Sequence, residues 1–346
     1  MKKVLALVVA CLLVSCTSEK VTENPILTIE GGQVQGVNAD IDGVVVYRGI
    51  PFAAPPIREN RWKAPQPVRP WEGVKVCDTF GHPAFQGAHY EGGYTTEWGY
   101  GEEKTYSEDC LYLNVWTKAS AQPEKKLPVA LWIFGGGLRE GWGSEPEFDG
   151  QEFAAKDVVL VSFNYRVGPF GFFAHPELLE EAGEQASGNF GTLDQIEALK
   201  WVQKNIAQFG GDPDNVTIFG QSAGGGSVRC LVSSPLAKPL ISKAIIMSAG
   251  GLNRALSAGT TQEEADQLGA AVYADKFTSM EELMAADWQT LYDVQQEYVK
   301  ATGNWRLSQP HLDGKLLTED FSEATLKNTL ADIPYMVGSV ANDMPG

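Results

Sequence analysis

The stretch VTIFGQSAGGGS, residues 216–227, sets one serine, Ser222, among glycines where two kinds of secondary structure meet. Residues 216–219 suit a buried strand, whereas residues 223–233 suit a helix. A strand that turns abruptly into a helix needs glycines beside the turn residue, because a side chain there would collide with the neighbouring strand or helix. The turn also leaves the serine oxygen exposed at its tip. We therefore predict that Ser222 is a nucleophile on a strand–turn–helix unit of an α/β fold.

Alternating strand and helix patterns along the chain indicate the same fold class. Residues 129–134 and 158–163 are apolar runs that end in turn-forming residues, as in strands covered on two faces. From residue 192 to 209 apolar residues recur at helical spacing, and Thr192 with Gln195 forms a candidate capping box. This alternation favours a layered α/β architecture with a parallel or mixed sheet. With 346 residues, the chain is long enough for one such domain.

A second glycine cluster, residues 135–137, follows the first of those strands directly. Main-chain amides with no side chains around them can be aimed at the oxyanion that forms when a serine attacks a carbonyl. We predict that the amides of Gly136 and Gly137, together with that of Ala223, form a three-donor oxyanion hole beside the serine. Losing one such donor typically raises the barrier by about 3 kcal/mol. The alternative is that the triplet serves only as a flexible turn.

The N-terminus, MKKVLALVVACLLVSC, is typical of an export signal, because two lysines precede an apolar run. The run is shorter than the roughly 20 residues that a membrane-spanning helix needs. Its end, LVSC, resembles a bacterial lipoprotein signal, in which the chain is cut before a cysteine that becomes lipid-modified. We expect residues 1–16 to be a signal peptide, Cys16 a lipid anchor and residues 17–26 a tether, with the protein in the cell envelope at the outer membrane or facing the periplasm. The alternative is an ordinary cleaved signal and a secreted protein.

Charge and cysteine content narrow the classes of partner. The net charge is −17, from 27 basic and 44 acidic residues, and this argues against nucleic acid as a partner. Beyond the N-terminal segment only Cys77, Cys110 and Cys230 remain, too few for a disulfide-rich scaffold. One disulfide and one buried thiol account for them most simply.

Five longer segments carry a resemblance to a known family. They are SEDCLYLNVW (107–116), WIFGGG (132–137), NYRVGPFGF (164–172), GNFGTLDQIEALKWVQKNIAQFGGDPDNVTIFGQSAGG (188–225) and KAIIMSAG (243–250). Together they resemble the type-B carboxylesterase and cholinesterase family of α/β-hydrolases. The resemblance implies an α/β-hydrolase fold over residues 27–346, with a central, mostly parallel twisted sheet and helices on both faces. It also implies that this domain is partial, with the fold incomplete at the C-terminus.

Carried over by position, the resemblance assigns roles to the residues of the site. It makes Ser222 the acyl-ester nucleophile and the amides of Gly136, Gly137 and Ala223 the oxyanion hole. It places Ser248 behind the catalytic triad as a supporting hydroxyl.

The resemblance also implies three structural pairs. They are a disulfide between Cys77 and Cys110, which closes a loop beside the active-site gorge, and two ion pairs, Arg48–Glu108 and Arg166–Asp194. The alternative for the four charged residues is a solvated surface position.

In this fold the triad follows the chain order serine, acid, histidine. The family's acid lies in a glycine-led turn after a strand, and the turn at residues 338–343 puts Asp343 at that place. An aspartate can orient and stabilise the imidazolium as a glutamate does. A solvated turn aspartate is the alternative, and Asp332 and Asp313 fit the order less well. The histidine should follow the acid, but residues 344–346 are Met, Pro and Gly.

None of the four histidines suits the role of triad base. His175 and His311 lie beside turns and are predicted at the surface, while His82 and His89 lie in the predicted disulfide loop, out of order. We expect the base to lie beyond the last residue and the chain as given to be almost inactive, because a serine without a base is a poor nucleophile at neutral pH. The last strand, near residues 335–340, would then lack a neighbour.

The leading hypothesis is an exported, lipid-anchored serine carboxylic-ester hydrolase. It would act on small-molecule esters and need neither a metal nor an organic cofactor, and it would meet a membrane only through the lipid anchor. The alternatives are a non-catalytic, cholinesterase-like binding or adhesion protein and the product of an incomplete pseudogene. The retained Ser222 with its glycines favours the enzyme, because a binding protein has no chemical reason to keep them.

Overall fold

The computed structural model describes residues 24–87, 105–182, 187–249, 260–304, 307 and 309–343. The predicted signal peptide, Cys16, most of the tether and His89 lie outside these residues. Within the described residues, no helix combines the length and the apolar character that crossing a bilayer requires.

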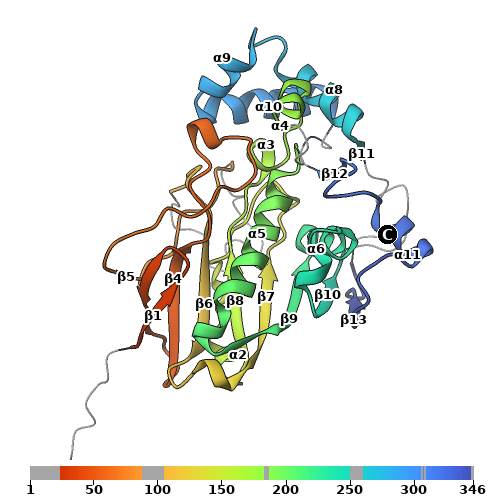
Figure 1. The fold of residues 1–346 in the computed structure, drawn as a ribbon. Helices are drawn as coiled ribbons and strands as arrows, with labels where there is room; N and C mark the ends of the chain where they lie inside the picture. The colour runs from red at the N-terminus through yellow and green to blue at the C-terminus, as the bar shows by residue number, and fades with distance from the viewer. Residues whose placement is uncertain are drawn as a thin grey trace, which may run out of the picture.

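A mixed sheet of eight strands occupies the centre of the molecule, in the order β13-β10-β9-β7-β8-β6-β4-β3 (Figure 1). Its strands are β3 (Val37–Asn38), β4 (Val44–Pro51), β6 (Tyr112–Lys118), β7 (Leu127–Ile133), β8 (Val159–Phe163), β9 (Gly211–Gln221), β10 (Lys243–Met247) and β13 (Tyr335–Gly338). From β8 through β7, β9 and β10 to β13 the neighbours are parallel, whereas β6, β4 and β3 pair in antiparallel fashion. The predicted central strands are confirmed as β7, β8 and the end of β9.

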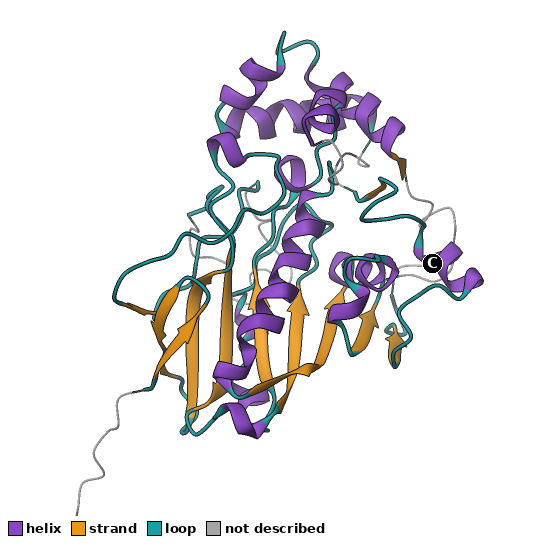
Figure 2. Cartoon of the chain, in the orientation of Figure 1, coloured by secondary structure: helices purple, strands orange, loops and turns teal. Residues whose placement is uncertain are grey.

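Two small sheets and the helices complete the described fold. The small sheets contain β1 (Ile26–Ile29), β2 (Gly32–Gln35) and β5 (Val74–Val76), and β11 (Thr260–Thr261) and β12 (His311–Leu312). The α-helices are α2 (Gln151–Ala155), α3 (Gly168–Gly171), α4 (Pro176–Ala182), α5 (Phe190–Asn205), α6 (Ala223–Ser233), α8 (Gln262–Tyr273), α9 (Met280–Ala285), α10 (Trp288–Thr302) and α11 (Phe321–Lys327). Short 3₁₀ turns are η1 (Arg58–Asn60), η2 (Pro123–Lys125), η3 (Pro146–Phe148), η4 (Ile206–Phe209) and η5 (Lys238–Leu240). Figure 2 shows α8, α9 and α10 grouped beyond the ends toward which the parallel strands point.

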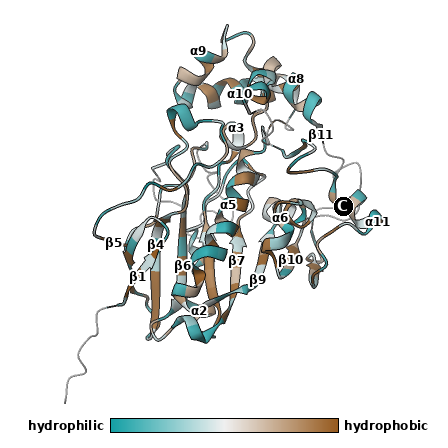
Figure 3. Ribbon diagram, in the orientation of Figure 1, coloured by the Kyte–Doolittle hydropathy of each residue, from teal (hydrophilic) through white to brown (hydrophobic). Residues whose placement is uncertain are grey.

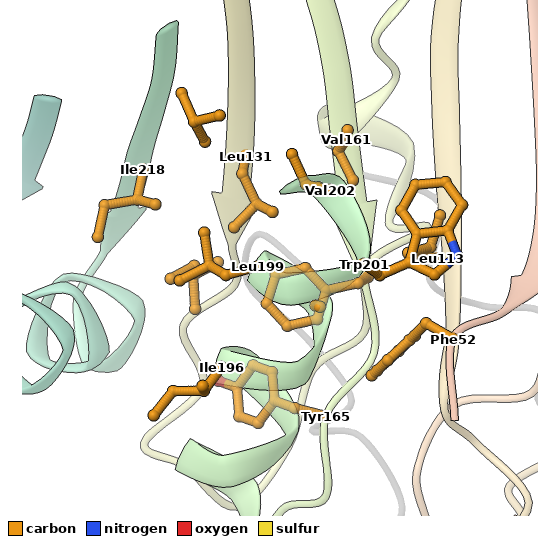
Figure 4. Packing of buried hydrophobic residues seen from close by; sticks show 14 of the residues in the cluster. Phe52, Leu113, Leu131, Val161, Tyr165, Ile196, Leu199, Trp201, Val202 and Ile218 are labelled. Carbon is orange, nitrogen blue, oxygen red and sulfur yellow. The ribbon is translucent and has the colours of Figure 1, made fainter. Parts of the chain in front are cut away.

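Alternate residues of the strands pack against helices on opposite faces of the sheet. Leu131 and Val161 belong to the main hydrophobic cluster together with Leu199 of α5 (Figure 4). Ala130, next to Leu131 in sequence, instead joins a cluster that includes Ala154 of α2. Successive side chains of a strand point to opposite faces, so the sheet is covered on both. In Figure 3 the central strands carry much of the hydrophobic colouring, as this arrangement requires.

The start of the long helix differs from the prediction. Thr192 was expected to cap it, but α5 begins at Phe190, and Asn189 stands at the cap position without a side-chain cap bond. Thr192 therefore lies inside the helix. The side chain of Gln195 does not bend back to a cap either, because its Nε2 donates to Ser227 Oγ of α6 at 2.9 Å. Tertiary packing of α5 on α6 outweighs the local capping signal at this helix end.

Strand β13 is exposed along its whole length. Tyr335 is 36% exposed, and Met336 and Val337 are each 65% exposed although their side chains point to opposite faces. Parallel strands are normally buried on both faces. In the described residues β13 pairs with β10 alone. This matches the expectation that the last strand has a free edge.

A charge on that edge is expected to reduce self-association. Unpaired edge strands with apolar side chains template pairing with another chain, and an edge lysine opposes it. We expect Val337→Lys to raise the protein concentration at which light scattering first detects large species. The control is Phe153→Lys, which removes a 41% exposed apolar side chain from helix α2, where no strand edge is open. An equal effect of the two substitutions would mean that general hydrophobicity, rather than the β13 edge, drives association.

Candidate active site

Ser222 occupies a strained turn between β9 and α6. Its backbone angles are φ 56° and ψ −126°, in a region that residues other than glycine seldom adopt. Such a conformation costs on the order of 1–3 kcal/mol and persists only where the surroundings enforce it. Here the N–H of Ser222 donates to Met247 O at 2.9 Å, and Ser222 O accepts from the N–H of Gly226 at 2.9 Å. The turn is therefore held both by the neighbouring strand and by the first turn of α6.

The glycines around Ser222 are required by close approach of the backbone. A Cβ on Gly220 would lie 2.5 Å from the carbonyl carbon of Gly224, and one on Gly224 would lie 2.1 Å from Ile133 O. Both neighbours are main-chain atoms, which cannot move aside as the end of a side chain can. The glycines therefore allow β7, β9 and the start of α6 to converge on the serine, as the sequence pattern predicts.

The glycine triplet lies directly beside Ser222. A Cβ on Gly135 would be 2.8 Å from Gln221 O and 3.3 Å from Ser222 Cβ. Gly136 and Gly137 have φ of 86° and 65°, which favour glycine over any other residue. The glycine triplet thus lies next to Ser222, as the sequence predicts.

The direction of two amides follows from the bonds around them. Gly136 O accepts from the N–H groups of Arg139 and Glu140, each at 3.1 Å, so it faces the turn that these residues form. In a trans peptide the N–H of Gly137 points the opposite way from that carbonyl, and hence away from the turn. The N–H of Ala223 lies in the first turn of α6, where no intrahelical acceptor exists and the helix dipole is positive. The Gly137 N–H, by its direction, and the Ala223 N–H, by its place at the positive end of α6, are therefore suited to bind an oxyanion.

Ser248 and Asp343 follow the next two strands of the sheet. Ser248 comes directly after β10, and its N–H donates to Gly338 O, the end of β13, at 2.8 Å. Asp343 lies in a turn closed by its N–H to Val340 O at 3.2 Å and by Val340 N–H to Asp343 Oδ2 at 3.4 Å. The elbow, Ser248 and the acid candidate therefore come after three adjacent strands. β9 and β13 are two strand spacings apart, roughly 10 Å.

The histidines of the described residues have other surroundings, and the position of one of them was predicted wrongly. His311 is 1% exposed, not at the surface. Its Nε2 lies 3.1 Å from both Ser187 O and Gln262 Oε1, and its N–H donates to Asn189 Oδ1 at 3.0 Å. The loop before α5, through Ser187 and Asn189, and Gln262 of α8 thus enclose it, which its position before a turn did not reveal. Among the described residues, no hydrogen bond of a histidine involves Ser222 or Asp343.

Burial lowers the pKa of His311 below its usual range, against a smaller opposing effect of Asp313. An unfolded histidine titrates near about 6.5, so between its folded and unfolded pKa values the unfolded chain binds more protons. Stability from this site is therefore complete above about pH 7 and is lost as the pH falls. We expect His311→Asn to flatten the dependence of the free energy of unfolding on pH between about 5 and 7, as measured by urea unfolding. The slope should change by at most about 1.4 kcal/mol per pH unit. His82→Asn, at an exposed position, should leave that dependence as in the parent.

The expected disulfide between Cys77 and Cys110 is not formed, and both are buried free thiols. Cys77 O accepts from the N–H of Arg48, whereas the segment of Cys110 bonds the N–H of Phe52 through Leu111 O. The two cysteines therefore lie beside different points of the chain, Cys77 beside Arg48 and the segment of Cys110 beside Phe52.

Within the part of the chain that the structure describes, no second cysteine lines the small cavity at Cys110. Cys110 lines a small cavity with Ala84 and Phe85, among others. Burial raises the pKa of Cys77 to about 12, so its thiol stays protonated and unreactive at neutral pH.

One of the two expected ion pairs is present and the other has a different partner. Arg166 and Asp194 form a buried pair, with Nη2–Oδ1 at 2.6 Å and Nε–Oδ2 at 2.8 Å. Glu108 pairs with Arg61, not Arg48, in a two-pronged contact with both distances 2.7 Å. Arg48 instead lies over the ring of Phe80, 5.2 Å from its centre. Arg61 follows a proline-rich loop, and no local pattern in the sequence links it to Glu108.

The comparison with known proteins decides the family. The model of the carboxylesterase family matches residues 23–345, nearly the whole chain. The chain belongs to the carboxylesterase family. Among its relatives, para-nitrobenzyl esterase of Bacillus subtilis is 38% identical over 330 residues, covering 92% of this chain and 63% of the relative. Fumonisin B1 esterase of Sphingopyxis macrogoltabida is 36% identical over 324 residues, covering 93% of this chain and 57% of the relative.

Solved structures of family members share the fold. A para-nitrobenzyl (PNB) esterase superposes with a TM-score of 0.81 at 37% identity, covering 92% of this chain and 63% of the other. A Geobacillus stearothermophilus carboxylesterase superposes with a TM-score of 0.76 at 34% identity, covering 91% and 62%. The predicted α/β-hydrolase fold is confirmed. This carboxylesterase-family chain spans about three fifths of the length of the curated relatives it matches.

Proposed function

We propose that this member of the carboxylesterase family is the part of a serine carboxylic-ester hydrolase that carries the nucleophile. The observation that supports this most strongly is the strained Ser222 elbow beside the glycine triplet. In the reaction, Ser222 Oγ attacks the ester carbonyl as a base takes its proton. The C–O bond to the alcohol then breaks, the alcohol leaves with that proton, and water releases the acid from the acyl-serine.

The amides of Gly136, Gly137 and Ala223 are proposed to hold the oxyanion of both tetrahedral intermediates. Donors of this kind are fixed before the reaction begins, so they need no reorganisation when the charge develops. The direction of the Gly137 N–H and the position of Ala223 at a helix N-terminus support this assignment.

Asp343 is proposed as the triad acid, with Ser248 as a supporting hydroxyl behind the triad. Ser248 follows β10, the strand next to β9, and Asp343 follows β13, the strand beyond β10. We propose that the histidine lies in polypeptide beyond Gly346, since no histidine of the described residues is bonded to the serine or the acid. The proposed histidine would act in the region between β9 and β13.

The substrate is proposed to be a small-molecule ester. The relatives' names, para-nitrobenzyl esterase and fumonisin B1 esterase, support an ester of a small molecule rather than of a polymer. The net charge of −17 opposes nucleic acid. We further propose that a lipid on Cys16 anchors the protein in the bacterial envelope.

A non-catalytic binding protein is the alternative. It would have no use for a serine held at φ 56°, a conformation that costs stability. An alanine or glycine would serve such a protein equally well, so the retained serine favours the hydrolase.

Covalent labelling tests the proposal. The full gene product is treated with a fluorophosphonate, and the modified peptide is located by mass spectrometry. We expect one phosphonyl group per chain, on the peptide that contains Ser222, and none in Ser222→Ala. Ser120→Ala, at an exposed serine, should label as the parent does. Equal labelling of Ser222→Ala and the parent would exclude Ser222 as the nucleophile.

A further inference from the structure

We infer that Gln86 is a positioning residue for the oxyanion loop, defined here as residues 135–141. The inference rests on the proposed function, since it concerns how the amides of that loop are held in place. Gln86 comes from a distant part of the sequence and touches the loop at its far end, at Gly141.

The amide side chain of Gln86 clamps the backbone of Gly141 from both sides. Gly141 N–H donates to Gln86 Oε1 at 2.8 Å, and Gln86 Nε2 donates to Gly141 O at 3.0 Å. The same Nε2 donates to Ala84 O at 3.1 Å, which ties the side chain to its own segment. The carboxamide thus pairs with a peptide group as a neighbouring β-strand would.

Gln86 has no freedom to leave this arrangement. It is 2% exposed, so an unmade hydrogen bond would not be replaced by water and would cost about 1–3 kcal/mol. The residues before and after Gln86 in the sequence are closely packed as well. Phe85 packs on Trp288 of α10 with ring centres 3.7 Å apart, and a Cβ on Gly87 would lie 1.9 Å from Tyr292 Oη. Helix α10 therefore packs directly against the residues on both sides of Gln86.

The loop transmits this restraint to the oxyanion amides. A Cβ on Gly136 would lie 2.1 Å from Glu140 O, so the two residues are in direct backbone contact. Gly136 O also accepts the N–H groups of Arg139 and Glu140. Gly141 follows Glu140 immediately, and therefore a shift of Gly141 moves the turn that sets the direction of the Gly137 N–H.

The other end of the loop is held independently. Tyr165 Oη donates to Phe134 O at 2.8 Å, and the two rings stack with centres 4.2 Å apart. Tyr165 thus restrains the point where β7 enters the loop, while Gln86 restrains the point where the chain leaves it. Just beyond the loop, Trp142 N–H donates to Glu145 Oε1 at 2.9 Å and Gly143 N–H donates to Asn164 Oδ1 at 2.8 Å, so Gln86 is the anchor that acts on the last residue of the loop itself.

The test is a kinetic comparison of Gln86→Met with the parent, made on the full gene product. Methionine has a similar volume but can neither donate to nor accept from Gly141. Misplacing catalytic groups by about 1 Å can cost about 100-fold, so we expect kcat to fall between about 10-fold and 100-fold while KM changes less than about threefold. Gln203→Met is the matched control, since Gln203 Nε2 also donates to two carbonyls, Pro213 O at 2.8 Å and Leu240 O at 3.1 Å.

A thionoester substrate separates a displaced oxyanion hole from general loosening. Sulfur accepts hydrogen bonds weakly, so aligned amide donors favour the oxygen ester over its thiono analogue. We expect the ratio of kcat/KM for the two substrates to collapse in Gln86→Met and to stay unchanged in Gln203→Met. If Gln86→Met does not fold, Gln86→Glu decides, because it keeps the shape and the acceptor for Gly141 N–H but lacks the amide donor. Faster deuterium uptake in peptides covering residues 135–141 should accompany either change.

The outcomes distinguish this inference from the proposed function. If Ser222→Ala hydrolyses the ester as fast as the parent, the proposed function fails. If Ser222 is required but the Gln86 variants keep both kcat and the oxygen-to-sulfur ratio of the parent, the inference about Gln86 is overturned and the proposed function stands.

Discussion

Replacing Ser222 with alanine in the full gene product is expected to lower kcat for ester hydrolysis by about 10⁶. The acyl-enzyme route needs an oxygen at the tip of the elbow, and alanine offers nothing to acylate. The oxyanion amides remain in the variant, so a residual acceleration of roughly 10³ over water is expected. The measurement is turnover of a p-nitrophenyl ester, with the urea midpoint as a check of folding.

Ser227→Ala is the matched control for this experiment. Ser227 lies further along the same helix, is buried, and its Oγ accepts the bond from Gln195. Its loss should cost about 1 kcal/mol of stability through the unsatisfied donor and leave the turnover intact. A Ser222→Ala variant as active as the Ser227→Ala variant would contradict the acyl-enzyme mechanism.

The elbow was predictable because its requirement is local. Gly220 and Gly224 flank Ser222 in sequence, and the backbone clashes that a Cβ would cause there are the same ones that make the pattern recognisable. The triplet at residues 135–137 was predictable for a related reason, since a buried strand ends immediately before it. Both features need only the succession of strand, turn and helix, without knowledge of distant contacts.

The errors concern contacts between distant parts of the chain. The residues around His311 in sequence are typical of a turn, yet the loop at Asn189 and Gln262 of α8 bury its side chain. The partner of Glu108 is decided by which arginine the 3D fold brings near, and Arg61 and Arg48 are alike in sequence terms. Gln86 carried no signal at all, because a carboxamide that binds a distant backbone looks like any other polar loop residue.

Breaking the Arg166–Asp194 pair is the second large effect that we expect. Asp194 is 0% exposed and Arg166 is 2% exposed, so neither charge has water in place of its partner. Arg166 donates to both carboxylate oxygens, and its Nη1 also donates to Lys63 O at 2.9 Å. Removing one partner of a buried pair leaves an uncompensated charge and typically costs 3–5 kcal/mol, so we expect Arg166→Met to lose about that much stability in urea unfolding.

The control for Arg166→Met is a pair of the same charges at the surface. Lys204 and Glu30 are 3.0 Å apart but are 53% and 42% exposed, and Lys204→Met should cost less than about 1 kcal/mol. Losses of equal size in the two variants would contradict the role assigned to burial.

The loss of stability in Arg166→Met should depend on pH, because the substitution leaves the Asp194 carboxylate without the guanidinium. In the folded parent, burial already raises the pKa of Asp194 against the opposing effect of Arg166. Without the guanidinium that opposition weakens, so the pKa of Asp194 in the folded variant lies further above that of the unfolded chain, about 3.9. The folded variant then binds a proton that the unfolded chain does not, so its stability relative to the parent improves as the pH falls. We therefore expect the difference in urea midpoint between parent and variant to be largest near neutral pH and to shrink toward acid. A difference that grows toward acid would show that the loss comes from packing of the arginine stem rather than from the stranded charge.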